Sequence, residues 1–322
     1  MLTRRVFAGG IGSVLAVAAA RGQSFPTKPI HLVVPYAPGT STDLTARQIA
    51  PKLASVLQGT VVVDNRGGAG GVVGAEAVAH AAPDGTTLLF AGSQTNAINP
   101  SLYAKLPYDP MKDFTPIARV GAPPMVLVVP PSLGVHSVGE LVALAKANPG
   151  KLNYASSGIG TTAHLCGSLL ATQAGINLVH VPYNSAAQAF SDLMNGEVSL
   201  MFYPYLPLAS LIQAKKLDVL ATTGAARPPY LPDAPTMREA GYPDFVITPW
   251  FAIYGPANVP KPVVDQLADA VLTTLRDPDI VQRMLATGND PFPGGPEELA
   301  KFTQSEIERY RGVVAASGAK VE

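Results

Sequence analysis

The 322-residue sequence contains very little cysteine. Cys166 is the only one, so no disulfide can join two parts of this chain. It lies in the stretch TTAHLCGSLLATQAG, on the apolar side of a predicted helix. We therefore expect a buried thiol that does not react.

Charge is also scarce. Lys and Arg together number 23, and so do Asp and Glu, which is 14% of the residues and a net charge of zero. Globular domains usually carry about 25% charged residues. With 47% hydrophobic residues, the composition indicates a large core or buried interfaces and argues against disorder. No basic cluster interleaves with aromatic residues, so we expect no nucleic-acid partner.

Known catalytic and metal-binding motifs are missing from the sequence. It has no G-x-S-x-G nucleophile motif, and its scattered histidines form no recognised metal spacing, so we expect no metal and no cofactor. His164 is the one histidine at a predicted loop–helix junction, where backbone groups near the helix start are the favoured partners. An exported hydrolase that pairs Ser157 or Ser41 with His164 stays open as a minor alternative.

The first segment, MLTRRVFAGGIGSVLAVAAA, has the features of an export signal. Arg4 and Arg5 form a basic start, an apolar run follows, and small residues end it. We predict a cleaved signal peptide over residues 1–23 and a mature protein outside the cytoplasm. Either the Sec or the twin-arginine route fits. No later stretch is long and apolar enough to span a bilayer.

Short apolar runs alternate with helical patterns along the rest of the chain, which predicts an α/β fold with largely parallel sheets. Strands are expected at residues 30–34, 60–64, 86–91, 125–129, 152–155, 178–181, 198–202, 218–221 and 250–254. Helices are expected to start near residues 42, 71, 138, 161, 186, 207, 260, 277 and 296.

Two segments resemble crossings between domains, at residues 119–124 and 247–250. Residues 122–248 would form one domain, which is of ordinary size. Residues 24–121 and 249–322 would together form the other. Two crossings make a two-strand hinge, and such a protein can close on a ligand in the cleft between its domains.

The loop at residues 35–42, PYAPGTST, follows a predicted strand and leads into a helix. Carboxyl ends of parallel strands meet at one edge, where ligands bind. A helix start also presents unpaired N–H groups and partial positive charge. Thr40, Ser41 and Thr42 either cap the helix only or also contact a ligand, and both interpretations stay open.

A second loop of the same kind follows a strand in the middle of the chain. Residues 158–163, GIGTTA, match the G-x-G-x-x-A spacing of a dinucleotide site. The acidic residue expected about 20 positions later is absent, since Asp192 is the first acid after the next strand. We therefore interpret these residues as a second polar loop that faces the first across the cleft.

The polar loops share one absence. Residues 93–99, 156–162 and 182–188 contain no Lys, Arg, Asp or Glu. An anion site without basic side chains must use backbone N–H groups, helix dipoles and hydroxyls. Such a site holds a carboxylate reversibly and supplies no strong acid or base.

Several long stretches, in order from about residue 25 to the C-terminus, resemble the Bug family. They include FPTKPIHLVVPYAPGTSTDLTAR, NPGKLNYASSGIGTTAHL and VHVPYNSAAQAFSDLMNGEVSLMF. These proteins are the periplasmic solute-binding proteins of tripartite tricarboxylate transporters. The resemblance is to the family and not to a particular ligand.

The resemblance implies a two-domain class II periplasmic-binding-protein fold and a monomer in the periplasm. It also implies a small mono- or dicarboxylate, aromatic ones included, which is passed to transporter subunits in the membrane. A ligand-sensing adaptor for a membrane receptor would have the same fold and cleft, so it stays open. The expected ligand-binding residues are Tyr36, Gly39, Thr40, Ser41, Asp43, Ser93, Asn96, Ser156, Ser157, Gly158, Thr161, Thr162, Tyr183, Asn184, Ala186 and Tyr203.

The sequence departs from the family pattern in two places that concern the site. Thr40 stands where the family usually has a second glycine, which adds a hydroxyl to the loop. Tyr203 stands where many members have an acid or a small residue. Tyr203 and Tyr205 either flank an aromatic or extended ligand or pack between the domains, and the sequence favours neither.

Overall fold

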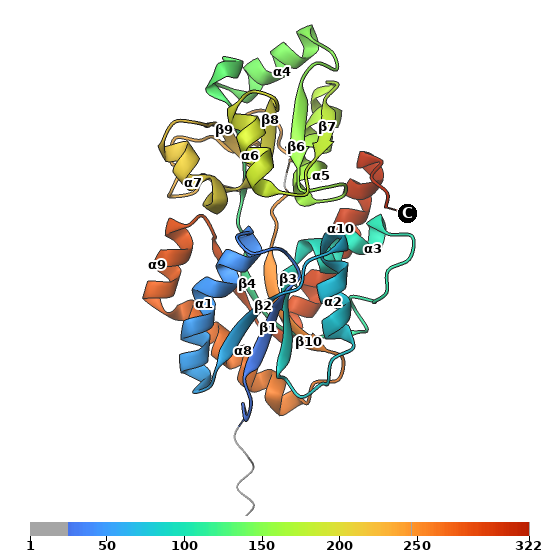
Figure 1. Ribbon diagram of the computed structural model, residues 1–322, viewed down its shortest axis with the longest axis vertical. Coiled ribbons are helices and arrows are strands. Elements are labelled where there is room, and N and C mark those ends of the chain that lie inside the picture. Colours follow the sequence, from blue (N-terminus) through green and yellow to red (C-terminus); the bar gives the residue numbers. More distant parts are fainter. Residues whose placement is uncertain (1–24, 246, 322) are drawn as a thin grey trace, which may run out of the picture.

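The computed structural model describes residues 25–245 and 247–321, and the predicted signal segment lies outside them. Two sheets, each flanked by helices, form a lower and an upper unit (Figure 1). Among the described helices, not one combines the length and the apolarity that a bilayer crossing requires.

The lower unit contains a six-stranded sheet in the order β11-β4-β10-β3-β1-β2. Its strands are β1 (Ile30–Val34), β2 (Val61–Asn65), β3 (Thr87–Gly92), β4 (Phe114–Gly121), β10 (Phe251–Pro256) and β11 (Pro291–Gly294). Its helices are α1 (Ser41–Leu57), α2 (Val72–Ala79), α3 (Asn99–Leu102), α8 (Lys261–Arg276), α9 (Pro278–Ala286) and α10 (Pro296–Ser317). A short π-helix, η2 (Ser93–Ile98), directly follows β3.

The upper unit contains a five-stranded sheet in the order β7-β6-β8-β5-β9. Its strands are β5 (Met125–Val129), β6 (Asn153–Ser156), β7 (Val179–Pro182), β8 (Leu200–Pro204) and β9 (Asp218–Thr222). Its helices are α4 (Val138–Ala147), α5 (Thr162–Ala174), α6 (Ala186–Met194) and α7 (Tyr205–Gln213). β5 is buried along its whole length, as expected for a strand covered on both faces.

Nine predicted strands are present within two residues of their expected starts, but β4 and β11 were not predicted. Both contain proline, which lacks the N–H that a strand ladder needs. Pro116 of β4 pairs with Tyr254 next to a register shift that accommodates it. β11 contains Pro291 and Pro293 and lies at the edge of its sheet. Prolines made both segments resemble loops in the sequence.

The expectation of largely parallel sheets is wrong. β1 runs parallel to β2 and β3, and β6 runs parallel to β7 and β8. However, β10 is antiparallel to β3 and β4, and β5 is antiparallel to β8 and β9. β5 and β10 are the first strands after the chain passes from one sheet to the other. Only residues 122–124 separate β4 from β5, so β5 starts at the edge facing the lower unit. β10 follows β9 after residues 223–250 and starts beside Gly92 and Gly121, where β3 and β4 end.

Each passage is anchored by hydrogen bonds made by the residues next to its ends. Ala122 N–H donates to the carbonyl of Asp290 at 2.9 Å, and Met125 exchanges bonds with Thr223 at 2.9 and 3.0 Å. In the second passage, the Trp250 carbonyl accepts from Ser93 N–H at 3.1 Å. The chain passes between the sheets after β4 ends at Gly121 and before β10 begins at Phe251, and residues 119–121 of the first predicted crossing belong to β4. The domain boundaries drawn from them stay a prediction.

Trp250 is fixed by a buried polar contact as well. Its indole Nε1 donates to Oε2 of Glu306 at 2.9 Å, and Glu306 is paired with Arg309. Trp250 is 1% exposed and Glu306 is 6% exposed. The long helix α10 therefore positions the second passage.

We predict that Gly92→Ala destabilises the protein by roughly 1–3 kcal/mol, as overpacking does. A Cβ at Gly92 would collide with the Trp250 carbonyl, a backbone atom that cannot rotate away. Gly312→Ala is the control, because Gly312 lies in α10 with nothing within 4 Å of a new Cβ. It should leave stability unchanged or raise it by about 0.5–1 kcal/mol. Urea unfolding measures both, and equal stability of the two variants would contradict the prediction.

Candidate functional site

The predicted loops follow strands whose carboxyl ends lie at the edges where the two sheets face each other. In the lower unit these are the loop after β1 and the π-helix η2 after β3. Figure 1 shows the amino-terminal end of α1 turned toward the upper unit. In the upper unit, loops follow β6 and β7, and Tyr203 lies near the end of β8. Gly160 of the β6 loop comes against Leu102 of α3, so the two units meet here.

The loop after β1 is held by a short set of local hydrogen bonds. Gly39 adopts φ +82° and donates its N–H to Oδ2 of Asp43 at 2.8 Å. Thr40 Oγ1 donates to the carbonyl of Ala37 at 2.9 Å and accepts from Asp43 N–H at 3.4 Å. Thr40 is therefore the N-cap of α1, as predicted, and both bonds of its hydroxyl stay inside the loop.

The loop after β6 repeats this arrangement at every position. Gly160 adopts φ +75° and donates its N–H to Nδ1 of His164 at 3.1 Å. Thr161 Oγ1 donates to the carbonyl of Gly158 at 2.8 Å and accepts from His164 N–H at 3.4 Å. The two loops are thus equivalent, with one in each unit. The lower loop uses Gly39, Thr40 and Asp43, and the upper loop uses Gly160, Thr161 and His164.

The equivalent loops leave equivalent backbone groups free. In each, the threonine takes the third N–H of the helix, on Asp43 or His164. The first two N–H groups of α1 (Ser41, Thr42) and of α5 (Thr162, Ala163) have no acceptor among the described residues. Helix N-terminal N–H groups of this kind bind anions.

A third polar element, η2, carries an unpaired donor. Asn96 is fully buried, its Oδ1 accepts from Thr95 Oγ1 at 2.6 Å, and its Nδ2 has no partner among the described residues. A buried donor without an acceptor costs roughly 1–3 kcal/mol. Ser93 is buried too, and its N–H donates a hydrogen bond to the Trp250 carbonyl. The side-chain amide of Asn96 is therefore a buried donor of η2 that is free to meet an oxygen atom, whereas the Ser93 N–H is not.

Some predicted ligand groups are engaged within the protein. Both carboxylate oxygens of Asp43 are occupied, since Arg47 and Asn65 each donate to Oδ1 at 2.9 Å and Gly39 N–H donates to Oδ2 at 2.8 Å. Ser156 Oγ is bonded to both backbone groups of Gly158 and to His180 Nε2. Asp43 and Ser156 therefore position the loops.

The tyrosines differ in their surroundings. Tyr36 is half-buried, and burial raises its pKa. Tyr183 donates its hydroxyl to Asp192 at 2.8 Å, and burial raises its pKa to about 12. Tyr203 packs edge-on against Phe190 in the upper core.

Tyr205 packs between the units, one of the two alternatives left open by the sequence. Its ring lies 4.8 Å from that of Tyr230, and a Cβ at Gly288 would come within 2.6 Å of its Cδ1. Of the remaining predicted site residues, Ser157 and Asn184 are exposed, whereas Gly158, Thr162 and Ala186 are half-buried.

Sequence reasoning missed the loop at residues 287–290, between α9 and β11. Gly288 contacts Tyr205, and its carbonyl accepts from the Tyr230 hydroxyl at 3.4 Å, so this loop of the lower unit touches the upper one. Burial raises the pKa of Asp290. The residues TGNDP have the composition of a turn, and only the fold brings them to the crossings.

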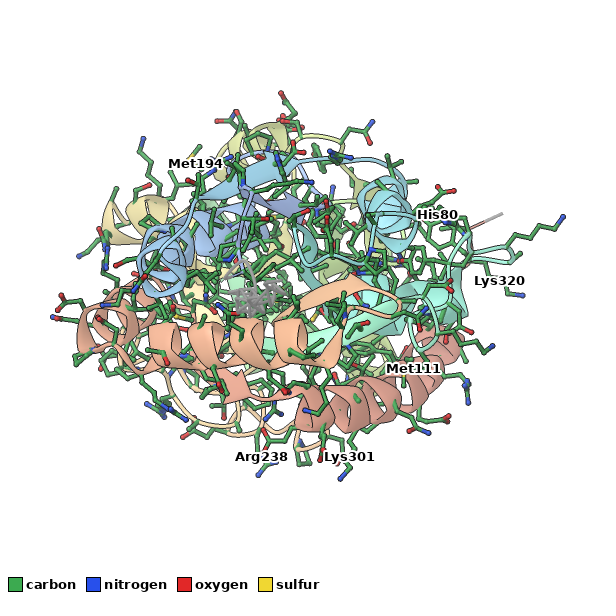
Figure 2. The ribbon with its side chains drawn as sticks, turned by 90° about the horizontal axis from the view of Figure 1, so that it is seen from below. His80, Met111, Met194, Arg238, Lys301 and Lys320 are labelled. Carbon is green, nitrogen blue, oxygen red and sulfur yellow. The ribbon has the colours of Figure 1, made fainter. Side chains whose placement is uncertain are left out.

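The alternative hydrolase site is not assembled in the described residues. His164 contacts Gly160, Tyr154 and His180, and no hydrogen bond joins it to Ser41 or Ser157. His80 lies at the periphery and points outward (Figure 2).

Residues 25–245 and 247–321 also hold no group of three or more His, Cys, Asp or Glu that fits a metal ion. Cys166 is buried as predicted, and burial raises the pKa of its thiol.

Comparisons with known proteins agree with this geometry. The family model described as "Tripartite tricarboxylate transporter family receptor" matches residues 45–319. BugT of Bordetella pertussis is 36% identical over 324 residues, covering 100% of this chain and 99% of that protein.

Solved structures match over nearly the whole described chain. The periplasmic binding protein BugD is 35% identical with a TM-score of 0.85, covering 92% of this chain and 100% of that one. An R. palustris protein solved with adipate is 33% identical with a TM-score of 0.88 at the same coverage. MatC from Rhodopseudomonas palustris, solved with bound malate, is 32% identical with a TM-score of 0.83, covering 90% of this chain and 100% of that one.

The Bug-family resemblance and the two-domain class II periplasmic-binding-protein fold are therefore confirmed. The chain belongs to the tripartite tricarboxylate transporter receptor family and is a solute-binding protein.

Proposed function

We propose that this protein captures a small carboxylate in the periplasm and passes it, chemically unchanged, to transporter subunits in the membrane. The two equivalent loops carry the proposal, because each presents two free helix N–H groups at the same edge. The solved relatives with adipate and malate support this ligand class. The export signal predicted from the sequence agrees with the location.

The amides of Ser41, Thr42, Thr162 and Ala163, together with Nδ2 of Asn96, are the proposed anion-binding groups. Hydrogen bonds to a charged group contribute about 1.5–3 kcal/mol each. Asp43 is the only charged side chain within the two helix starts, and it is paired with Arg47. A carboxylate held by neutral donors alone forms no ion pair with the protein and can be released.

We expect malate, adipate or another small carboxylate to raise the thermal stability of the mature protein. Ligand bound to the folded state alone adds RT ln(1 + [L]/Kd), which is about 2.7 kcal/mol at a hundredfold excess over Kd. Thermal unfolding against a panel of organic acids, each at several concentrations, measures the effect. The corresponding amides of these acids are the control and should give no shift.

A panel that gives no shift with any carboxylate would contradict the proposal. Turnover of an ester substrate would instead support an exported enzyme. Capture of a receptor kinase rather than transporter subunits from membranes, only with ligand present, would support the sensing adaptor.

Thr161→Ala should weaken both folding and binding. Loss of the N-cap costs roughly 0.5–2 kcal/mol of stability. The freed His164 N–H and the loosened Gly158 carbonyl also disturb the loop that holds the ligand. We expect Kd to rise about tenfold, which corresponds to about 1.4 kcal/mol.

Ser137→Ala is the matched control for this variant. Ser137 caps α4 in the same way, accepting from Glu140 N–H at 3.1 Å, but it does not lie in the loops at the facing edges. It should lose similar stability and keep its affinity for the ligand in calorimetric titration. Equal affinities of the two variants would mean that the Thr161 loop is only structural.

A further inference from the structure

We propose that His164 is a positioning residue for the ligand loop of the upper unit, and that His180 holds the other half of the same loop. This inference rests on the proposed function. It assigns a role to two histidines that belong to no catalytic or metal site among the described residues.

The contact between His164 and Gly160 requires a neutral imidazole. Gly160 donates its backbone N–H to Nδ1 at 3.1 Å, and Nδ1 accepts only when it carries no proton. Gly160 has φ +75°, one of several conformations open to glycine, so the hydrogen bond to its N–H helps to fix the loop in this one. Asp43 supplies the same support to Gly39 through a carboxylate oxygen. His164 therefore does with a neutral ring what Asp43 does with a charged group.

His180 supports the other glycine of the loop through Ser156. Its Nε2 lies 2.6 Å from Ser156 Oγ, which in turn bonds the N–H and the carbonyl of Gly158 at 3.1 and 2.9 Å. Ser156 is fully buried, so solvent does not compete for these bonds. One histidine thus holds Gly158, and the other holds Gly160.

The two rings also lie close enough together to disfavour protonation of both at once. Their centroids are 4.1 Å apart, and Tyr154 packs against both. Tyr154 from β6 and His180 from β7 are the titratable groups that contact the His164 ring. α10 also packs against α5, and its Arg309 acts on Cys166. Among the described residues, no carboxylate contributes to the pKa shift of either histidine. Like charges at this distance disfavour double protonation.

The direction of the pKa shifts agrees with this geometry. Burial lowers the pKa of His164, and burial together with the charge of His164 lowers that of His180 to about 4. Above the ordinary histidine pKa of 6.5, both rings are neutral whether the chain is folded or not. As the pH falls toward 4, the unfolded chain binds protons first, so stability is lost over this range. Protonation of His164 also removes the acceptor for Gly160.

The decisive comparison is His164→Asn against His164→Leu. Asparagine presents an oxygen that can reach the Gly160 N–H as the Asp43 oxygen reaches Gly39, whereas leucine presents none. With malate or adipate at pH 7.5, we expect Kd within about threefold of wild type for His164→Asn and at least about tenfold higher for His164→Leu. Amide hydrogen exchange of the ligand-free proteins should show faster exchange at Gly160 in His164→Leu only.

The pH dependence separates positioning from packing. The ratio of the wild-type Kd to the His164→Asn Kd should rise as the pH falls from 7.5 to 4.5, and ionisation of the ligand cancels in this ratio. His80→Asn, at an exposed histidine, is the control and should give a constant ratio near one.

Tight binding by His164→Leu, or a ratio for His164→Asn that stays constant with pH, would overturn the inference while leaving the proposed function intact. If wild-type protein bound no carboxylate, the proposed function would fail instead. The exchange rate at Gly160 would then still decide whether His164 holds the loop. If His164→Leu did not fold, the comparison of wild type with His164→Asn would remain.

Discussion

The structure depends on one geometric constraint, which is that both passages of the chain between its two sheets meet the lower sheet at the same edge. β4 ends there at Gly121, and Trp250 is bonded there to Ser93 just before β10 begins. A strand that leaves a sheet at the edge facing its neighbour must be followed by a strand that starts at the facing edge. β5 and β10 meet this requirement by running antiparallel to the strands beside them. The crossings and the loops after β1, β3 and β6 therefore gather at the same place.

At that place, the proposed site is built mainly from backbone groups. Two helices begin with the same arrangement of glycine, threonine and a side chain three residues after the threonine. In each, the cap satisfies the third N–H and leaves two free. Since the structure uses Asp43, Ser156 and Tyr183 internally, side chains shape the loops while N–H groups remain to meet the ligand.

Much of this was visible in the sequence, because it depends on local chemistry. The Thr40 cap, the helix starts and the uncharged loops follow from neighbouring residues, as does the prediction that backbone near a helix start satisfies His164. The hydrogen-bond partners of Asp43 and Ser156 could not be predicted from neighbouring residues, because Asn65 and His180 come from other strands. β4 was missed because the register shift that tolerates Pro116 exists only once β10 lies beside it.

The short crossings have an entropic consequence for ligand capture. In the first crossing, Ala122 is bonded to the lower unit and Met125 to the upper, so two residues are left between these anchors. In the second crossing, Trp250 is bonded to the lower unit. The two crossings contain Pro123, Pro124 and Pro249. The φ angle of each proline is fixed, and each also restricts the backbone conformation of the residue before it. Ordering a flexible residue costs about 1–2 kcal/mol. The predicted closure of the cleft would therefore spend little of the binding free energy on ordering these residues, and more of it would remain as affinity.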